Sequence, residues 1–117
     1  MGAVHRRRPD GSWEGVQPRG YEAHPDVRRH ELIAAPHYRV RYFEVQPGGR
    51  TALERHAHDH GVVIQSGRAR VTLGEQRHEL GPGAVVYVGP DELHCFEALG
   101  DEPLGFICVA PPRGRGA

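Results

Sequence analysis

Short apolar runs alternate with polar positions along most of the chain, and turn residues separate these runs at close intervals. No stretch keeps a helical spacing of apolar residues for more than about two turns, whereas a period of two is typical of half-buried strands. We therefore expect strands at residues 28–34, 38–46, 50–56, 60–65, 69–73, 76–80, 84–88, 94–98 and 104–109. Turns are expected at Pro47-Gly48-Gly49, Ser66-Gly67, Gly74-Glu75, Gly81-Pro82-Gly83 and Gly100-Asp101.

Many short strands with turn residues between them predict an all-β sandwich or small barrel. At 117 residues and 13.0 kDa the chain has room for one modest core. We expect a flexible segment at residues 1–20, a single β-barrel domain at 21–111 and a tail at 112–117. Trp13 and Tyr21 are the aromatic residues near the N-terminus that are able to pack on the barrel or on a partner chain.

The charge balance argues against nucleic acid and membrane surfaces as partners, because 15 Lys and Arg offset 15 Asp and Glu. A small-molecule substrate is the expected partner instead. No apolar run approaches the roughly 20 residues that span a bilayer, and no apolar signal-peptide segment follows the basic N-terminus, so we expect a cytoplasmic protein. Cys95 and Cys108 lack CxxC spacing, which predicts neither a disulfide framework nor a zinc knuckle.

Three of the nine histidines fall within five residues, in the segment Leu53–Gly61 that reads LERHAHDHG. Imidazoles at such close spacing beside a carboxylate are typical of a transition-metal site. The histidines outside this segment and its partner motif are expected to be solvated: His5, His24, His30, His37 and His78.

The segments PGG-x4-ERHAHDH-x6-G and GPGAVVYVGPDELHCF resemble the two motifs of the cupin superfamily, G-x5-HxH-x3/4-E-x6-G and G-x5-PxG-x2-H-x3-N. The resemblance covers roughly residues 40–111 and implies a double-stranded β-helix, or jelly-roll, barrel. In the second motif Gly89 replaces the Pro, Asp91 replaces the Gly and Ala98 replaces the Asn, whereas the metal-binding His94 is kept.

Counting from the flanking glycines of the first motif, and adding the second motif, gives three imidazoles and one carboxylate as metal ligands: Glu54, His56, His60 and His94. A competing register replaces Glu54 by His58 and gives an all-histidine site. In the Glu54 register, His58 lies at the tip of a turn, where it is able to act as an acid or base at the site mouth.

Several strand residues are candidates for the substrate pocket. Arg41, in phase with Phe43, either binds a substrate carboxylate or is exposed on an edge strand. Cys108 either faces the cavity as a redox-sensitive neighbour of the metal or is a small core residue. Phe96 either lines the pocket or only packs. The expected pocket is Arg41, Phe43, Phe96 and Cys108, with His58 and Arg41 as the catalytic groups.

Such a ligand set suits a divalent transition metal, and open coordination positions are typical of catalytic sites. Resemblance to cupins implies that both oxidative and Lewis-acid chemistry occur in the family, and of these we expect an oxygenase with Fe, Mn or Cu acting on a small organic substrate. It also allows an isomerase or lyase on a sugar acid, using Zn or Ni as a Lewis acid, or a binding or sensing module without turnover. A homodimer, with Trp13 or Tyr21 near its interface, is a further family-level expectation that light scattering would test.

Overall fold

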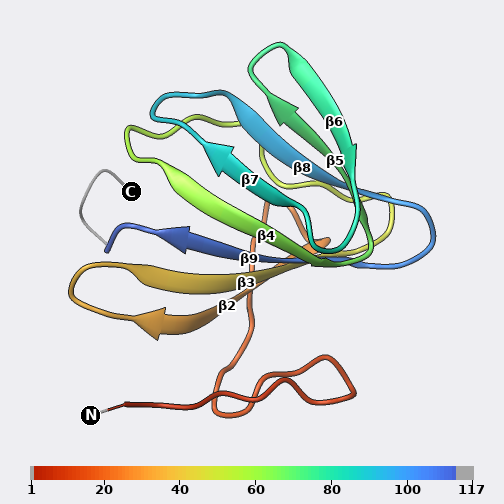
Figure 1. The fold of residues 1–117 in the computed structure, drawn as a ribbon. Helices are drawn as coiled ribbons and strands as arrows, with labels where there is room; N and C mark the ends of the chain where they lie inside the picture. The colour runs from red at the N-terminus through yellow and green to blue at the C-terminus, as the bar shows by residue number, and fades with distance from the viewer. Residues whose placement is uncertain (1, 113–117) are drawn as a thin grey trace.

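Two antiparallel β-sheets face each other in the computed structural model, which describes residues 2–112 (Figure 1). Of the predicted tail, residues 113–117 therefore lie outside the described chain. The larger sheet has the order β1-β2-β3-β9-β4-β7, formed by Arg19–Gly20, Val27–Ala34, Arg39–Val45, Leu104–Ala110, His60–Ser66 and Val85–Val88. The smaller sheet has the order β6-β5-β8, formed by Gln76–Leu80, Arg68–Leu73 and His94–Leu99.

The prediction of an all-β jelly-roll fold is confirmed. The strands pair far across the sequence, since β9 lies between β3 and β4 and β8 pairs with β5. Each observed strand from β2 to β9 begins and ends within two residues of an expected one. Residues 2–112 contain no helix able to span a lipid bilayer.

The expected strand at residues 50–56 is not a regular strand, which corrects the sequence analysis. The segment runs beside β8 but pairs with it only at two isolated bridges, Arg50 with Glu97 and Glu54 with His94. Between these bridges it advances four residues where β8 advances three, so the ladder loses its register. The hydroxyl of Thr51, in place of a backbone carbonyl, accepts the amide hydrogen of Phe96 at 2.9 Å.

The core lies between the two sheets and is built from alternate residues of the strands. The β3 and β9 residues that face inward include Val45, Leu104 and Phe106. Those of the smaller sheet and of β4 include Val71 and Ile64. Because side chains from both sheets meet here, the inward face that continues toward one end of the barrel is also the wall of its cavity.

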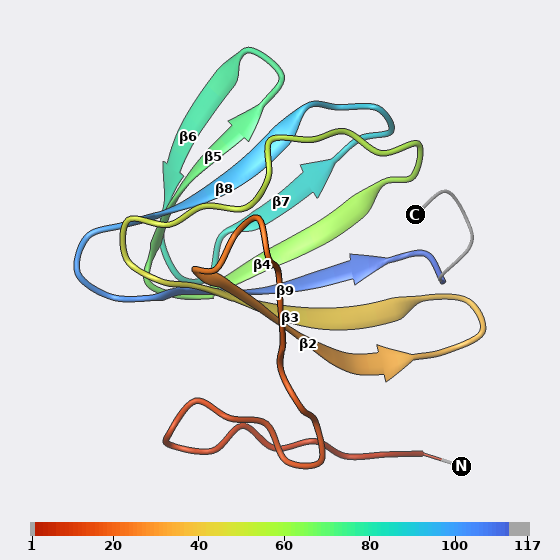
Figure 2. The ribbon, with the colours of Figure 1, turned by 180° about the vertical axis from the view of Figure 1, so that it is seen from behind.

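The N-terminal segment lies beyond β2 and β3, on the side of the larger sheet away from the smaller one (Figures 1 and 2). Trp13 packs on Tyr42 with ring centroids 5.4 Å apart, and the guanidinium of Arg7 lies 4.9 Å from the same ring. His30 contacts Tyr42 from β2 and is only 4% exposed, so the expectation that it is solvated is wrong. Burial lowers the pKa of His30, which favours its neutral form.

Gly105 on β9 leaves room for the buried Tyr42 side chain. A Cβ at this position would overlap the Tyr42 hydroxyl and lie 2.6 Å from the Ser66 hydroxyl. We expect Gly105→Ala to lower the free energy of unfolding by about 1–3 kcal/mol, because overpacking displaces neighbours. Gly61→Ala on adjacent β4 is the matched control, since nothing lies within 4 Å of its Cβ position. Urea denaturation measures both, and equal losses would contradict the steric argument.

Candidate metal centre

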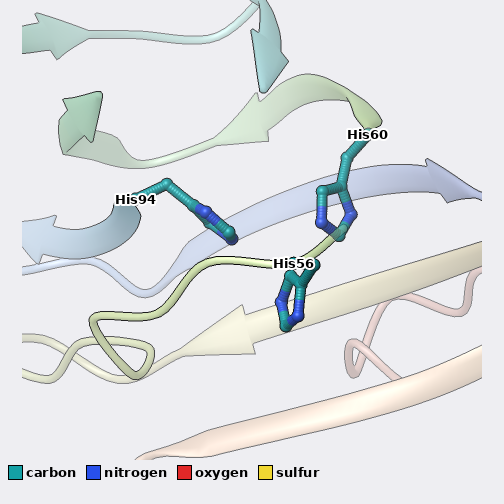
Figure 3. Close-up of side chains that lie close together, drawn as sticks. All are labelled: His56, His60 and His94. Atoms are coloured by element: carbon teal, nitrogen blue, oxygen red, sulfur yellow. The ribbon is translucent and has the colours of Figure 1, made fainter. Parts of the chain in front are cut away.

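Three imidazoles converge at one end of the barrel (Figure 3). His60 is the first residue of β4, His94 is the first residue of β8, and His56 lies in the irregular segment before β4. One ring nitrogen from each lies within 4.8 Å of the other two. Donor atoms that all contact one transition-metal ion at about 2.1 Å must lie this close together, so the cluster has the dimensions of a metal site.

Backbone hydrogen bonds join the segments that carry His56 and His94. Glu54 and His94 exchange two of them, at 3.1 and 2.9 Å, and the amide of Asp91 donates to the carbonyl of His56 at 2.6 Å. Asp91 has a φ of 58°, in the left-handed region that favours glycine. It stands where the cupin pattern has a glycine, and aspartate is among the side chains that tolerate this conformation. The departure from the motif therefore keeps the turn.

The hydrogen bonds of His94 and His60 leave one nitrogen of each ring available for a metal. His94 Nδ1 lies 2.8 Å from the carbonyl oxygen of Glu92, which only accepts, so Nδ1 carries the proton and Nε2 keeps its lone pair. His60 Nε2 is buried and has no hydrogen-bond partner in the structure, while His60 Nδ1 lies 3.4 Å from the sulfur of Cys108. A buried nitrogen without a partner is costly; a metal ligand bond would satisfy it.

The surroundings of His60 and His56 favour neutral rings. Burial, followed by electrostatic repulsion from the neighbouring His58 and His94 rings, lowers the pKa of His60 to about 3. Burial also lowers the pKa of His56, while the Glu54 carboxylate acts in the opposite direction. Neutral imidazole is the form that binds a metal.

Glu54 and His58 both lie beside the three-histidine cluster. A carboxylate oxygen of Glu54 lies 3.2 Å from His56 Nε2, and this side chain is 49% exposed. The ring of His58 lies 5.0 Å from that of His56 and 4.7 Å from that of His60, measured between centroids. Neither residue belongs to the set of donors that lie mutually within 4.8 Å. The choice between them as fourth ligand therefore stays a prediction.

The cluster opens into a cavity of about 320 Å³ between the two sheets. This volume is at the small end of the range for ligand sites. The four residues expected in the pocket all line it, together with His58: Arg41, Phe43, Phe96 and Cys108. Phe43 and Phe96 each stack on Phe106, with ring centroids 5.1 and 4.6 Å apart, and form an aromatic wall.

Arg41 and Cys108 are neighbours across β3 and β9. Arg41 is only 8% exposed and lies on an interior strand of the sheet, so the alternative of an exposed edge residue is wrong. Its guanidinium donates to the Cys108 sulfur at 3.3 Å. Cys108 is both a core residue and a cavity residue, and burial raises the pKa of its thiol.

The sequence analysis did not assign to the cavity several residues that line it, including His24, which it expected to be solvated, and two arginines, Arg29 and Arg39. Arg39 precedes Arg41 by two positions on β3, so the alternation that indicated Arg41 also applied to it. Arg29 pairs with Phe43 across β2 and β3, and this cross-strand register was not readable from the sequence.

The sequence profile that describes the cupin domain matches residues 41–110. The chain belongs to the cupin family. Among curated proteins, this cupin is 44% identical over 70 residues to 1-methylthio-D-xylulose 5-phosphate methylsulfurylase of Rhodospirillum rubrum. The match covers 60% of this chain and 45% of that protein, so the cupin spans less than half of its relative's length.

Two solved cupin structures are also similar. A cupin-2 domain from Rhodospirillum rubrum has a TM-score of 0.80 and 38% identity, covering 86% of this cupin and 72% of that chain. A cupin 2 conserved barrel domain protein from Rhodopseudomonas palustris has a TM-score of 0.82 and 35% identity, covering 93% and 80%. The fold is thus that of a small cupin, and this cupin carries a three-histidine cluster with the dimensions of a metal site.

Proposed function

We propose that this cupin is a metal-dependent enzyme that acts on a small carbonyl-containing substrate without oxidising it, as an isomerase or lyase does. The observation that carries the proposal is the convergence of His56, His60 and His94 on the cavity. The unpartnered His60 Nε2 adds support, because it points to a ligand bond that the protein itself does not make.

The relative's name supports a small carbonyl-containing substrate. A methylsulfurylase of 1-methylthio-D-xylulose 5-phosphate acts, as named, on a phosphorylated ketose. The identity of 44% extends over 70 residues, which is 60% of this chain. A ketose offers a carbonyl oxygen and neighbouring hydroxyls, the groups that a metal site of this kind binds.

The roles of the chain's own residues follow from their positions. A metal held by the three histidines, with Glu54 as proposed fourth ligand, would polarise a substrate oxygen as a Lewis acid. His58 lies beside the cluster and lines the cavity, so it is placed to take a proton from the adjacent substrate carbon or to return one. The stacked phenylalanines limit the access of water to that wall of the cavity.

An oxygenase is the second candidate. The observation in its favour is the carboxylate of Glu54 beside His56, because mixed imidazole and carboxylate ligands are found in non-haem iron oxygenases. Fe, Mn or Cu would accompany this chemistry, whereas Zn or Ni would suit the Lewis-acid reaction. Elemental analysis of protein purified without a histidine tag identifies the metal.

Turnover without oxygen tests the proposal. We expect the metal-loaded protein to convert a member of a panel of phosphorylated ketoses and sugar acids at the same rate in air and under anaerobic conditions. An oxygen electrode provides the second readout. Turnover that stops without O₂ would replace the proposal by the oxygenase, and metal-loaded protein that binds but never converts the panel would make it a binding module.

A further inference from the structure

A cluster of three arginines forms the part of the cavity wall contributed by β2 and β3. Arg29, Arg39 and Arg41, here called the arginine cluster, all line the cavity. Arg39 and Arg41 are 5% and 8% exposed. Guanidinium groups are rarely buried to this extent without partners, because removing a charge from water is costly. The charged and polar groups around these arginines therefore indicate which kind of ligand they bind.

One carboxylate of the protein, that of Glu31, forms ion pairs with members of this cluster. Glu31 lies 3.6 Å from Arg29 and 3.8 Å from Arg39. Arg39 also donates to the carbonyl of Pro111 at 2.8 Å, which gives it a structural role. Three positive charges next to one negative charge leave an excess of about two, so the wall favours a ligand with two negative charges.

Arg41 is the member whose charge is least satisfied. In the described part of the chain no ion pair joins it to a carboxylate, and its contacts are the Cys108 sulfur and the face of Phe43 at 5.0 Å. Its Nε is buried without a hydrogen-bond partner. A guanidinium presents two parallel N–H groups to a carboxylate or phosphate, so its unused donors are suited to an anion in the cavity.

The arginine cluster and the metal site belong to one cavity. The sulfur of Cys108 lies 3.3 Å from an Arg41 nitrogen and 3.4 Å from His60 Nδ1. One sulfur atom thus separates the guanidinium from the ring of a proposed metal ligand. A small molecule that reaches both sites carries its anionic group at one end and its reacting oxygen at the other.

We propose that the arginine cluster binds the phosphate group of a small phosphorylated substrate, with Arg41 as its main contact. This inference rests on the proposed function. A phosphate monoester carries close to two negative charges at neutral pH and has three acceptor oxygens. It matches both the charge excess and the number of guanidinium groups better than a single carboxylate does. The substrate class is therefore a phosphorylated carbonyl compound.

Calorimetric titration with inorganic phosphate tests the subsite on the full chain, as purified and after chelation. At constant ionic strength, we expect binding in both forms. Arg41→Gln should weaken it by about tenfold or more, since charge-assisted hydrogen bonds are lost. Arg41→Lys should lie in between because it keeps the charge without the planar donor pair. Arg77→Gln, on an exposed position of β6, is the matched control and should bind as wild type does.

Three results would overturn the proposal: no phosphate binding by the wild type, unchanged binding by Arg41→Gln, or acetate binding as tightly as phosphate. Arg29→Gln gives a second test if Arg41→Gln does not fold, because Arg29 is less buried. Metal affinity, measured on the same samples, separates the two hypotheses. Phosphate binding without metal affinity would refute the proposed function alone, and metal affinity without phosphate binding would refute the subsite alone.

Discussion

His94→Ala is expected to abolish metal binding. The substitution removes a buried imidazole whose Nε2 lone pair faces two other histidines, and leaves at most two imidazoles in the cluster. Loss of a group that only orients a ligand costs roughly 10–100-fold in affinity, so the loss of a ligand should exceed that range. The fold should survive, because the backbone of residue 94 is held by its two hydrogen bonds with Glu54 and not by the ring.

Competition with a chromophoric chelator measures this effect, with elemental analysis as a second readout. Thermal unfolding gives a third, since a metal at 100 times its Kd stabilises a protein by about 2.7 kcal/mol. Wild type should gain stability with metal and His94→Ala should not. His78→Ala, which removes an exposed histidine from β6, is the control and should behave as wild type. If His94→Ala bound the metal with wild-type affinity, the three-histidine site would be refuted.

Glu54→Ala is expected to weaken metal binding by more than about tenfold, whereas His58→Ala is expected to keep it. The physical reason lies in the position of the carboxylate. Its oxygen lies 3.2 Å from His56 Nε2, and two ligands at right angles around one ion, each about 2.1 Å from it, lie about 3 Å apart. The backbone pairing of Glu54 with His94 holds this residue next to a second ligand.

The pair of variants decides the register in a single experiment, because each is the control of the other. Glu54→Gln sharpens it: the side chain keeps its size but loses the charge that a divalent ion prefers. If His58→Ala loses the metal and Glu54→Ala retains it, the ligands are instead four histidines, with His58 as the fourth. Under the Glu54 assignment, His58→Ala should impair turnover while the bound metal content stays at the wild-type value.

Strand positions were readable from the sequence because their signal is local. An exposed side chain next to a buried one imposes a period of two on the sequence, and the turns at Gly67 and Gly74 have the positive φ angles, 74° and 60°, that glycine adopts readily. The prediction of a strand at residues 50–56 was wrong because strand pairing there depends on a distant part of the chain. Its alternation is strand-like, but whether a ladder forms depends on the register with β8, which an extra residue interrupts.

The environment of His30 shows a similar limit. Nothing in its sequence neighbourhood indicates burial, because the residues that cover this face, Trp13 and Arg7, come from a segment rich in Gly, Pro and Arg. Only the packing of that segment on Tyr42 makes the outer face of β2 and β3 a second buried layer. The two-period pattern of these strands assumes one buried face, and here both faces are covered.

By itself, the sequence determined the all-β class, the strand positions and the histidines that form the three-histidine cluster, because alternation and motif spacing are properties of neighbouring residues. The tertiary structure alone decided which distant residues share the cavity. Antiparallel pairing of β3 with β9 brings Arg41 to Cys108, and pairing with β2 adds Arg29. Such contacts depend on the register between strands that lie far apart in the sequence. Arg41 and Cys108, for example, are 67 residues apart, and a single chain carries no local signal of that register.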